Sequence, residues 1–256
     1  MSKTRRSKKY KARRRISRRR YSKKKRRRTR RSKKGGVPID IQPGDILVMN
    51  FGGNVPFTSY KHVAVAVSGI VSDQGSTFLP LAHCGGRGCI LSCLEYIPNN
   101  NNKTIWVLRY RGPHTEELRN YAAHIAETWA KSGKLQFSKC RMLRALLPCF
   151  SHQADRKTGK RYMQALTTSS QLPRYDNEKY IGMFCSKFGL AVWMAAIGSF
   201  YDTDQLNWEA LDKCLPLKPS NCAPWDLISL PKKIPDCWKK VGKFKGWGQW
   251  MDIKIT

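Results

Sequence analysis

The sequence lacks acidic residues throughout its N-terminal end. Residues 1–34 contain 22 Lys and Arg side chains and no Asp or Glu, and Tyr10 and Tyr21 are their only aromatic residues. A run of like charges with so little apolar surface cannot collapse into a core. The sequence therefore predicts a disordered basic arm, residues 1–36, followed by one globular domain, residues 37–256.

The scarcity of aromatic residues in the arm also limits how the arm can bind. Without rings to stack on bases, we expect phosphate contacts to dominate, so that binding is independent of base sequence and sensitive to salt. Nucleic acid is the expected partner, and a nuclear targeting signal or an anionic membrane surface are the alternatives. The candidate phosphate-binding residues are Arg13, Arg14, Arg15, Arg18, Arg19, Arg20, Lys23, Lys24, Lys25, Arg26, Arg27 and Arg28.

Long apolar runs are missing as well. None approaches the roughly 20 residues that cross a bilayer, and no apolar segment follows the basic start as it does in a secretory signal peptide. We therefore expect an intracellular protein that no signal peptide secretes, with the nucleus or a virion as the suspected location. The nine cysteines of such a chain are expected to be free thiols rather than a disulfide framework.

Signals for cofactor sites are weak. The glycine-rich turn Gly85-Gly86-Arg87-Gly88 lacks the Lys-Ser/Thr pair of a nucleotide-binding loop. His83, Cys84, Cys89 and Cys93 lie within eleven residues and fit either zinc ligands or thiols buried in a sheet, but they contain no Cys-x-x-Cys pair. We expect neither a cofactor nor a metal.

After the hinge Gly35-Gly36-Val37-Pro38, short apolar runs alternate with turn signals. They predict strands over residues 46–49, 62–69, 78–83, 89–92 and 105–110. Helical spacing predicts a helix from an N-cap at Thr115 to about Trp129, an irregular insertion over 132–174, and a second helix over 184–197. The C-terminal segment, with Pro224, Pro231 and Pro235, is predicted to form loops that end in the packing residues Trp238, Trp247 and Trp250. The expected fold class is α+β.

Three local features of the domain can act together chemically. Pro43-Gly44-Asp45 forms a turn before a strand, His62 begins a strand, and Cys185 opens an apolar helix. The N–H groups at a helix N-terminus stabilise a thiolate, and a neighbouring histidine can act as a base. Each residue alone also fits a structural role: Asp45 as a turn residue, Cys185 as a small core residue and His62 as a hydrogen-bonded or surface residue.

The order of these features resembles the circularly permuted NlpC-like branch of the papain-fold cysteine peptidases and amidases, which includes the lecithin–retinol acyltransferase-like enzymes. Lys187 stands where many relatives have Glu. The resemblance covers about residues 37–110 and 180–231. The pieces that carry it are Pro43-Gly44-Asp45-Ile46-Leu47-Val48, Lys61-His62-Val63-Ala64-Val65-Ala66-Val67, Ala82-His83, Leu94-Glu95-Tyr96, Phe184-Cys185-Ser186-Lys187-Phe188 and Pro224-Trp225-Asp226-Leu227.

This resemblance implies a permuted papain-like fold, in which a small antiparallel barrel-like sheet packs on a helix that bears the cysteine. It implies Cys185 as nucleophile, His62 as base and His83 as the polar residue that orients His62. The expected activity is thiol-dependent hydrolysis or acyl transfer on an unknown amide or ester. Virus-encoded members of the branch exist, so the alternative is a non-catalytic nucleic-acid packaging or virion protein that has kept the fold.

Overall fold

The chain divides into two units, residues 1–38 and 39–256. The computed structural model describes residues 40–50, 61–73, 75–97, 103–132, 135, 137, 183–200, 208–216 and 222–252, all of them in the second unit. The predicted disordered arm and most of the predicted insertion lie outside the described residues.

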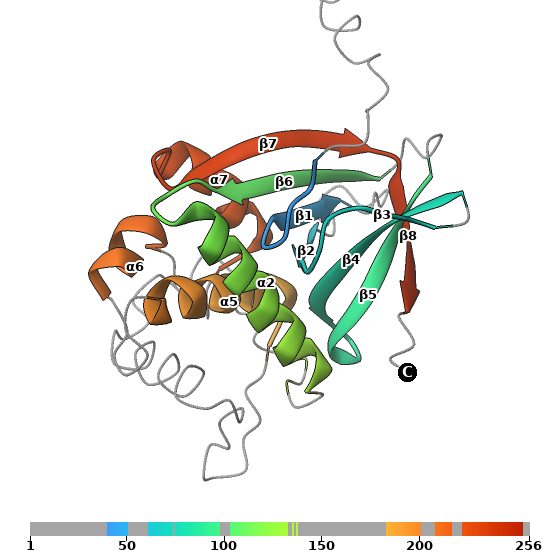
Figure 1. Cartoon of the computed structure of the whole chain (residues 1–256), viewed down its shortest axis with the longest axis horizontal. Coiled ribbons are helices and arrows are strands. Elements are labelled where there is room, and N and C mark those ends of the chain that lie inside the picture. The colour runs from blue at the N-terminus through green and yellow to red at the C-terminus, as the bar shows by residue number, and fades with distance from the viewer. Residues whose placement is uncertain are drawn as a thin grey trace, which may run out of the picture. The chain divides into compact units, whose positions relative to one another are not determined.

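The second unit is built on one antiparallel sheet that curls into a half-barrel (Figure 1). The hydrogen-bonded order is β7-β6-β1-β2-β4-β5-β8, and β3 pairs with β4. The predicted α+β class is confirmed at this level. The strands are β1 (Ile46–Asn50), β2 (Lys61–Ala66), β3 (Val71–Asp73), β4 (Ser76–Gly85), β5 (Gly88–Tyr96), β6 (Thr104–Tyr110), β7 (Trp238–Lys245) and β8 (Trp247–Asp252).

The curl of the sheet depends on the bend between β7 and β8, because these consecutive strands pair at opposite ends of the order. The chain bends at Gly246, whose φ is 94°, and a Cβ there would lie 2.5 Å from a ring carbon of Tyr96. Only glycine fits this position. Trp247 then packs against Tyr96 with 5.2 Å between ring centroids. The predicted packing roles of Trp247 and Trp238 are confirmed, since both are buried; the side chain of Trp250 lies outside the described part.

Alternation along the strands gives the sheet two apolar faces. The helix face packs against α2 (Thr115–Lys131) and α5 (Cys185–Ser199), which lie together on one side of the sheet in Figure 1. The barrel face lines the inside of the half-barrel. Val63, Val65, Ala82 and Cys84 belong to the helix face, whereas Leu47, Ala64, Leu81, Leu94 and Val107 belong to the barrel face.

Two boundary predictions need correction. Thr115 is the first residue of α2 rather than its N-cap, which is His114, and the Thr115 hydroxyl donates to the Gly112 carbonyl instead. The predicted C-terminal loops are α7 (Pro224–Lys233) followed by β7 and β8, with the short α6 (Trp208–Cys214) before them. Pro224 starts α7, where a missing N–H costs nothing, and the Asp226 carboxylate accepts the Ala223 N–H at 2.8 Å. No helix in the described ranges is long and apolar enough to span a bilayer.

The expectation that all cysteines are free thiols is wrong for one pair. Cys214, at the end of α6, and Cys237, just before β7, form a disulfide between buried positions. The Trp238 indole N–H donates to the Cys214 carbonyl at 2.7 Å and holds the same two segments together. The other described cysteines are free thiols, namely Cys84, Cys89, Cys93, Cys185 and Cys222.

The turn before β1 is confirmed, and Asp45 also takes part in a buried ion pair. The Asp45 carboxylate accepts the Gln42 backbone N–H at 2.9 Å, and it accepts Arg109 Nε at 2.8 Å and a second Arg109 nitrogen at 2.7 Å. Asp45 is fully buried and Arg109 nearly so. Arg109 also donates to the Asp40 carbonyl, so this one side chain of β6 fixes the turn that leads into β1.

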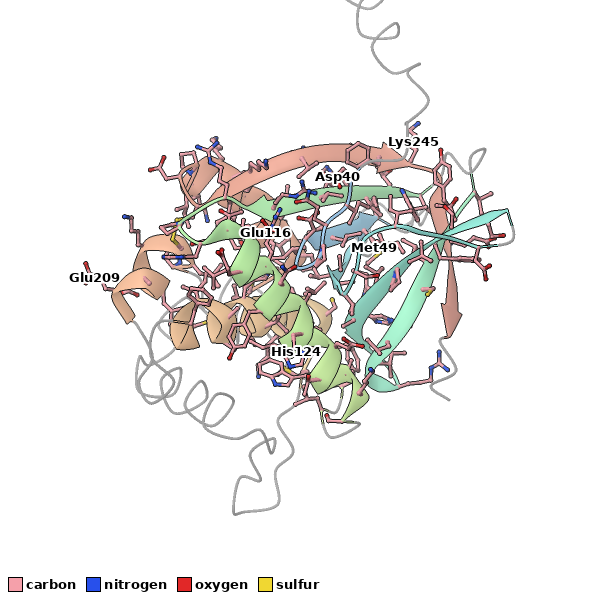
Figure 2. The ribbon with its side chains drawn as sticks, viewed as in Figure 1. Asp40, Met49, Glu116, His124, Glu209 and Lys245 are labelled. Atoms are coloured by element: carbon pink, nitrogen blue, oxygen red, sulfur yellow. A yellow bond between two sulfur atoms is a disulfide. The ribbon has the colours of Figure 1, made fainter. Side chains whose placement is uncertain are left out.

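Replacing Asp45 with Ala should therefore destabilise the domain strongly. The variant leaves the buried Arg109 guanidinium without its carboxylate, which costs about 3–5 kcal/mol. Asp40→Ala is the matched control, because the Asp40 carboxylate is 75% exposed and interacts with the same guanidinium at 3.7 Å. Its expected cost is below about 1 kcal/mol. Urea unfolding measures both, and equal effects would contradict the structural role given to Asp45. Figure 2 labels Asp40.

Candidate active site

The candidate nucleophile lies where α5 meets β2. Phe184 is extended, with φ −142° and ψ 166°, and the helix begins at Cys185. Gly189, one turn further along, allows close packing, since a Cβ there would lie 3.0 Å from Val63 Cγ1. The close approach brings the Cys185 sulfur to the backbone N–H of Val63, and the N–H groups of Cys185 and Ser186 are its other hydrogen-bond partners. Three backbone N–H groups thus converge on this sulfur.

The start of α5 is also held by a hydrogen bond to the segment that precedes α7. The Ser186 hydroxyl donates to the Cys222 carbonyl at 2.6 Å, immediately before α7 begins. Further along α5, the Trp193 indole N–H donates to the Gly44 carbonyl at 2.9 Å, in the turn before β1. The helix that carries Cys185 is therefore held by hydrogen bonds at two points to segments distant in sequence.

The structure brings His62 and His83 into direct contact. His62 Nε2 on β2 and His83 Nδ1 on β4 lie 2.9 Å apart and share a hydrogen bond, and the two rings meet edge to face. The register explains the contact, because Ala64 lies opposite His83 and His62 is two residues away on the same face. The 21-residue separation in sequence is spanned by β3 and its turns.

Sequence reasoning missed Ser92 as the next member of this chain of hydrogen bonds. Ser92 Oγ lies 3.0 Å from His83 Nε2, so His62, His83 and Ser92 form one hydrogen-bonded series across three neighbouring strands. Ser92 is buried. On β5, Ile90 lies opposite His83, and Ser92 is the next residue on that face. The β4–β5 hairpin was predicted, so its alternation could have identified Ser92.

Cys185 and His62 belong to opposite faces of β2. Val63 points to the helix face, where Cys185 packs, whereas alternation places His62 on the barrel face with Ala64. The His62–Val63 peptide lies between them, and its N–H contacts the thiol sulfur. The His62 ring and the Cys185 thiol thus belong to opposite faces of β2, close to the start of the strand.

The two candidate catalytic groups are both neutral at neutral pH. Burial, and to a lesser degree the neighbouring His83, lowers the pKa of His62 to about 3. Burial raises the pKa of the Cys185 thiol to about 11, although the surrounding N–H groups oppose that change. The resting site therefore holds a thiol and an imidazole rather than a thiolate–imidazolium pair, so a nucleophilic reaction at this sulfur would require its deprotonation in the same step.

The zinc interpretation of the β4–β5 cysteines is disfavoured by their geometry. Cys84 and Cys89 lie opposite each other and face the helices, whereas His83 belongs to the barrel face and bonds to His62. Burial raises the pKa of Cys89, as expected for a core thiol. Within the described ranges, no group of three or more His, Cys, Asp or Glu side chains is arranged to hold a metal ion.

The twelve predicted phosphate-binding residues of the arm, between positions 13 and 28, lie outside the described residues. Comparisons of the chain with protein-family models, with curated proteins and with solved structures found no match.

The pKa of His62 predicts how stability depends on pH. Between about pH 6.5 and about pH 3 the unfolded chain binds a proton on this residue that the folded chain does not. The free energy of unfolding should therefore decrease as the pH is lowered from about 6.5 to about 3, with a contribution from His62 of up to about 1.4 kcal/mol per pH unit.

His62→Gln should remove this contribution. His124→Gln is the control, because His124 is exposed on α2 and is labelled in Figure 2. Urea unfolding of the three proteins from about pH 7 to about pH 4 measures the slopes. Parallel curves for the native protein and His62→Gln would show that His62 ionises normally in the folded state.

Proposed function

We propose that residues 39–256 form a thiol-dependent hydrolase or acyltransferase of the cysteine peptidase and amidase type, with Cys185 as nucleophile, His62 as base and His83 as its orienting partner. The observation that carries the proposal is the hydrogen-bonded series His62–His83–Ser92. Its first member, His62, directly precedes Val63, whose backbone N–H is a hydrogen-bond partner of the Cys185 sulfur. The basic arm would hold this activity on nucleic acid.

We also propose the permuted papain-like topology. Its support is the order of the parts along the chain: the Asp45 turn, the His62 strand, the His83 strand, the helix opened by Cys185 and the α7 segment that starts at Pro224. The half-barrel packed on α5 is the arrangement that this topology requires. The proposed fold and the proposed chemistry thus use the same residues.

In the proposed reaction the sulfur of Cys185 attacks the carbonyl carbon of an amide or ester as its proton passes to His62 Nδ1. The backbone N–H groups at the start of α5, which contact the sulfur in the resting site, would donate to the negative oxygen that forms. His62 then returns the proton to the departing nitrogen or oxygen as the C–N or C–O bond breaks, which leaves a thioester on Cys185. Water, or another acceptor, attacks that thioester and gives its proton to His62, which returns a proton to the Cys185 sulfur as the C–S bond breaks and the acid or the acylated acceptor leaves.

The proposal places one steric requirement on His62. Because the imidazole and Val63 belong to opposite faces of β2, Nδ1 must meet the thiol around the first residues of the strand. A neutral imidazole with a lowered pKa is able to accept the proton at neutral pH, since it is already in its basic form. Because the proposed proton transfer accompanies attack on a carbonyl carbon, a carbonyl substrate tests this site more directly than a thiol reagent does.

A second candidate function is favoured by the burial of Cys185. Cys185 is only 8% exposed, and burial raises the pKa of its thiol above that of an ordinary cysteine. Buried thiols of this kind are usually inert core residues. In this alternative the domain is a non-catalytic nucleic-acid packaging or virion component, and the arm supplies its function.

The two functions differ in whether Cys185 accepts an acyl group. With p-nitrophenyl acetate as the activated ester, we expect acetylation of Cys185, located by peptide mass spectrometry so that arm lysines are counted separately. His62→Ala should slow that acetylation by about 100-fold or more, in the range of general-base catalysis.

His124→Ala and Cys93→Ser are the matched controls, since His124 is exposed and Cys93 is a more exposed free thiol than Cys185. Both variants should leave the acetylation of Cys185 unchanged. Acetylation that is no faster at Cys185 than at Cys93, or that does not respond to His62→Ala, would favour the packaging function.

The arm predicts a steep salt dependence of nucleic-acid binding. Replacing the twelve candidate residues between positions 13 and 28 with Gln should make the slope of log K against log salt less negative by up to about 11 for duplex DNA, because each lost phosphate contact removes about 0.9 from the slope. Fluorescence anisotropy with two duplexes of unrelated sequence measures this slope. An unchanged slope, or affinities that differ strongly between the duplexes, would contradict phosphate binding by the arm.

A further inference from the structure

Ser92 occupies the end of the hydrogen-bonded series, where its hydroxyl can set the direction of every bond before it. It lies on β5, 2% exposed, opposite Leu81 and diagonal to His83 on the barrel face. Its oxygen is 3.0 Å from His83 Nε2, and His83 Nδ1 is 2.9 Å from His62 Nε2. A hydroxyl can donate or accept, so the series can be polarised in either of two directions.

The two directions have opposite consequences for His62. If Ser92 accepts, His83 carries its proton on Nε2, its Nδ1 accepts from His62 Nε2–H, and His62 Nδ1 has a lone pair. If Ser92 donates, His83 carries its proton on Nδ1, His62 Nε2 accepts it, and His62 must carry a proton on Nδ1. A neutral histidine protonated on Nδ1 cannot take a proton at that atom.

We infer that Ser92 is a positioning residue that accepts the Nε2–H of His83 and thereby holds His62 in the tautomer whose Nδ1 can take the thiol proton. The inference rests on the proposed acyl-transfer function. Ser92 touches neither the sulfur nor a substrate in this arrangement, and it acts entirely through His83.

The same direction also suits the charged intermediate. When His62 takes the proton, both of its nitrogens carry hydrogen, and Nε2–H still donates to His83 Nδ1 while His83 Nε2–H still donates to Ser92. No bond in the series has to reverse between the neutral and charged states. A pre-set direction of this kind removes a reorganisation step from proton transfer.

A serine is suited to this position because it accepts a hydrogen bond without bringing a charge. The barrel face around it is apolar, with Leu81 and Leu94 fully or almost fully buried. A carboxylate there would need its own partner and would favour protonation of the histidines. Serine adds no charge beside the histidines, which agrees with the lowered pKa of His62.

The tautomers can be read directly by long-range proton–nitrogen correlation spectra of the full chain labelled with nitrogen-15 in histidine. At about pH 7 we expect Nε2–H on both His62 and His83. Ser92→Ala removes the acceptor and leaves a buried N–H unpaired, so the series should reverse to Nδ1–H on both rings. Ser92→Thr keeps a hydroxyl and should keep the native tautomers, and Ser72→Ala, at an exposed serine of β3, should change nothing.

Acetylation of Cys185 by p-nitrophenyl acetate supplies the second readout. Ser92→Ala should slow it by about 10- to 100-fold, the range seen when the partner that orients a metal-binding histidine is removed, and Ser92→Thr should restore most of the rate. Nδ1–H on His83 in the native protein overturns the inference, as do native tautomers in Ser92→Ala.

Failure of the proposed acyl-transfer function and failure of the role given to Ser92 are distinguishable. If the native tautomers are as inferred but Cys185 is not acetylated, the proposed function fails and the catalytic role of Ser92 fails with it. If Cys185 is acetylated in a His62-dependent manner while His83 carries its proton on Nδ1, the proposed function stands and only the role of Ser92 is overturned. The native protein alone decides the second case, so the test does not depend on the folding of Ser92→Ala.

Discussion

The candidate site depends on the close packing of α5 against β2. Gly189 lets the helix approach so closely that a Cβ at this position would crowd Val63 Cγ1, and this approach sets the position of Cys185 relative to the strand. The same contact removes water from the thiol, which raises the pKa of Cys185. It also brings three backbone N–H groups to the sulfur, and these act in the opposite direction. The helix N-terminus supplies stabilisation for a thiolate, but here desolvation outweighs it.

That balance determines what kind of chemistry the site can perform. A preformed ion pair would need an imidazole that holds its proton, whereas burial beside His83 lowers the pKa of His62 far below neutrality. Neutral partners favour concerted proton transfer, as in hydroxyl nucleophiles, and this makes the tautomer of His62 decisive. The direction of two hydrogen bonds on the barrel face then matters more than the net charge of the site.

Much of this architecture could be predicted from local sequence. The β-branched run of β2, the small apolar residues of α5 and the turn at Asp45 each carry a local signal that the structure bears out. β7 was missed because its Lys-rich residues belong to an edge strand, whose exposed side chains hide the alternation of a buried strand. α7 could not be predicted because its two prolines are typical of loops, although Pro224 stands at the first helical position. The Cys214–Cys237 pairing joins segments brought together only by tertiary packing, and no local pattern could reveal it.

The choice between a catalytic and a purely structural domain turns on why a hydrogen-bonded pair of histidines, His83 buried and His62 half-buried, exists at all. Packing alone does not require histidines, because apolar residues of similar volume would fill the barrel face. Apolar residues would also avoid the loss of stability at low pH that follows from the lowered pKa of His62. Local departures of this kind from the requirements of packing are expected at functional sites. The His62–His83–Ser92 series is such a departure, and its two hydrogen bonds measure 2.9 Å and 3.0 Å. Burial of Cys185 argues for a structural thiol, but it does not explain this series, whereas acyl transfer with a neutral base accounts for both.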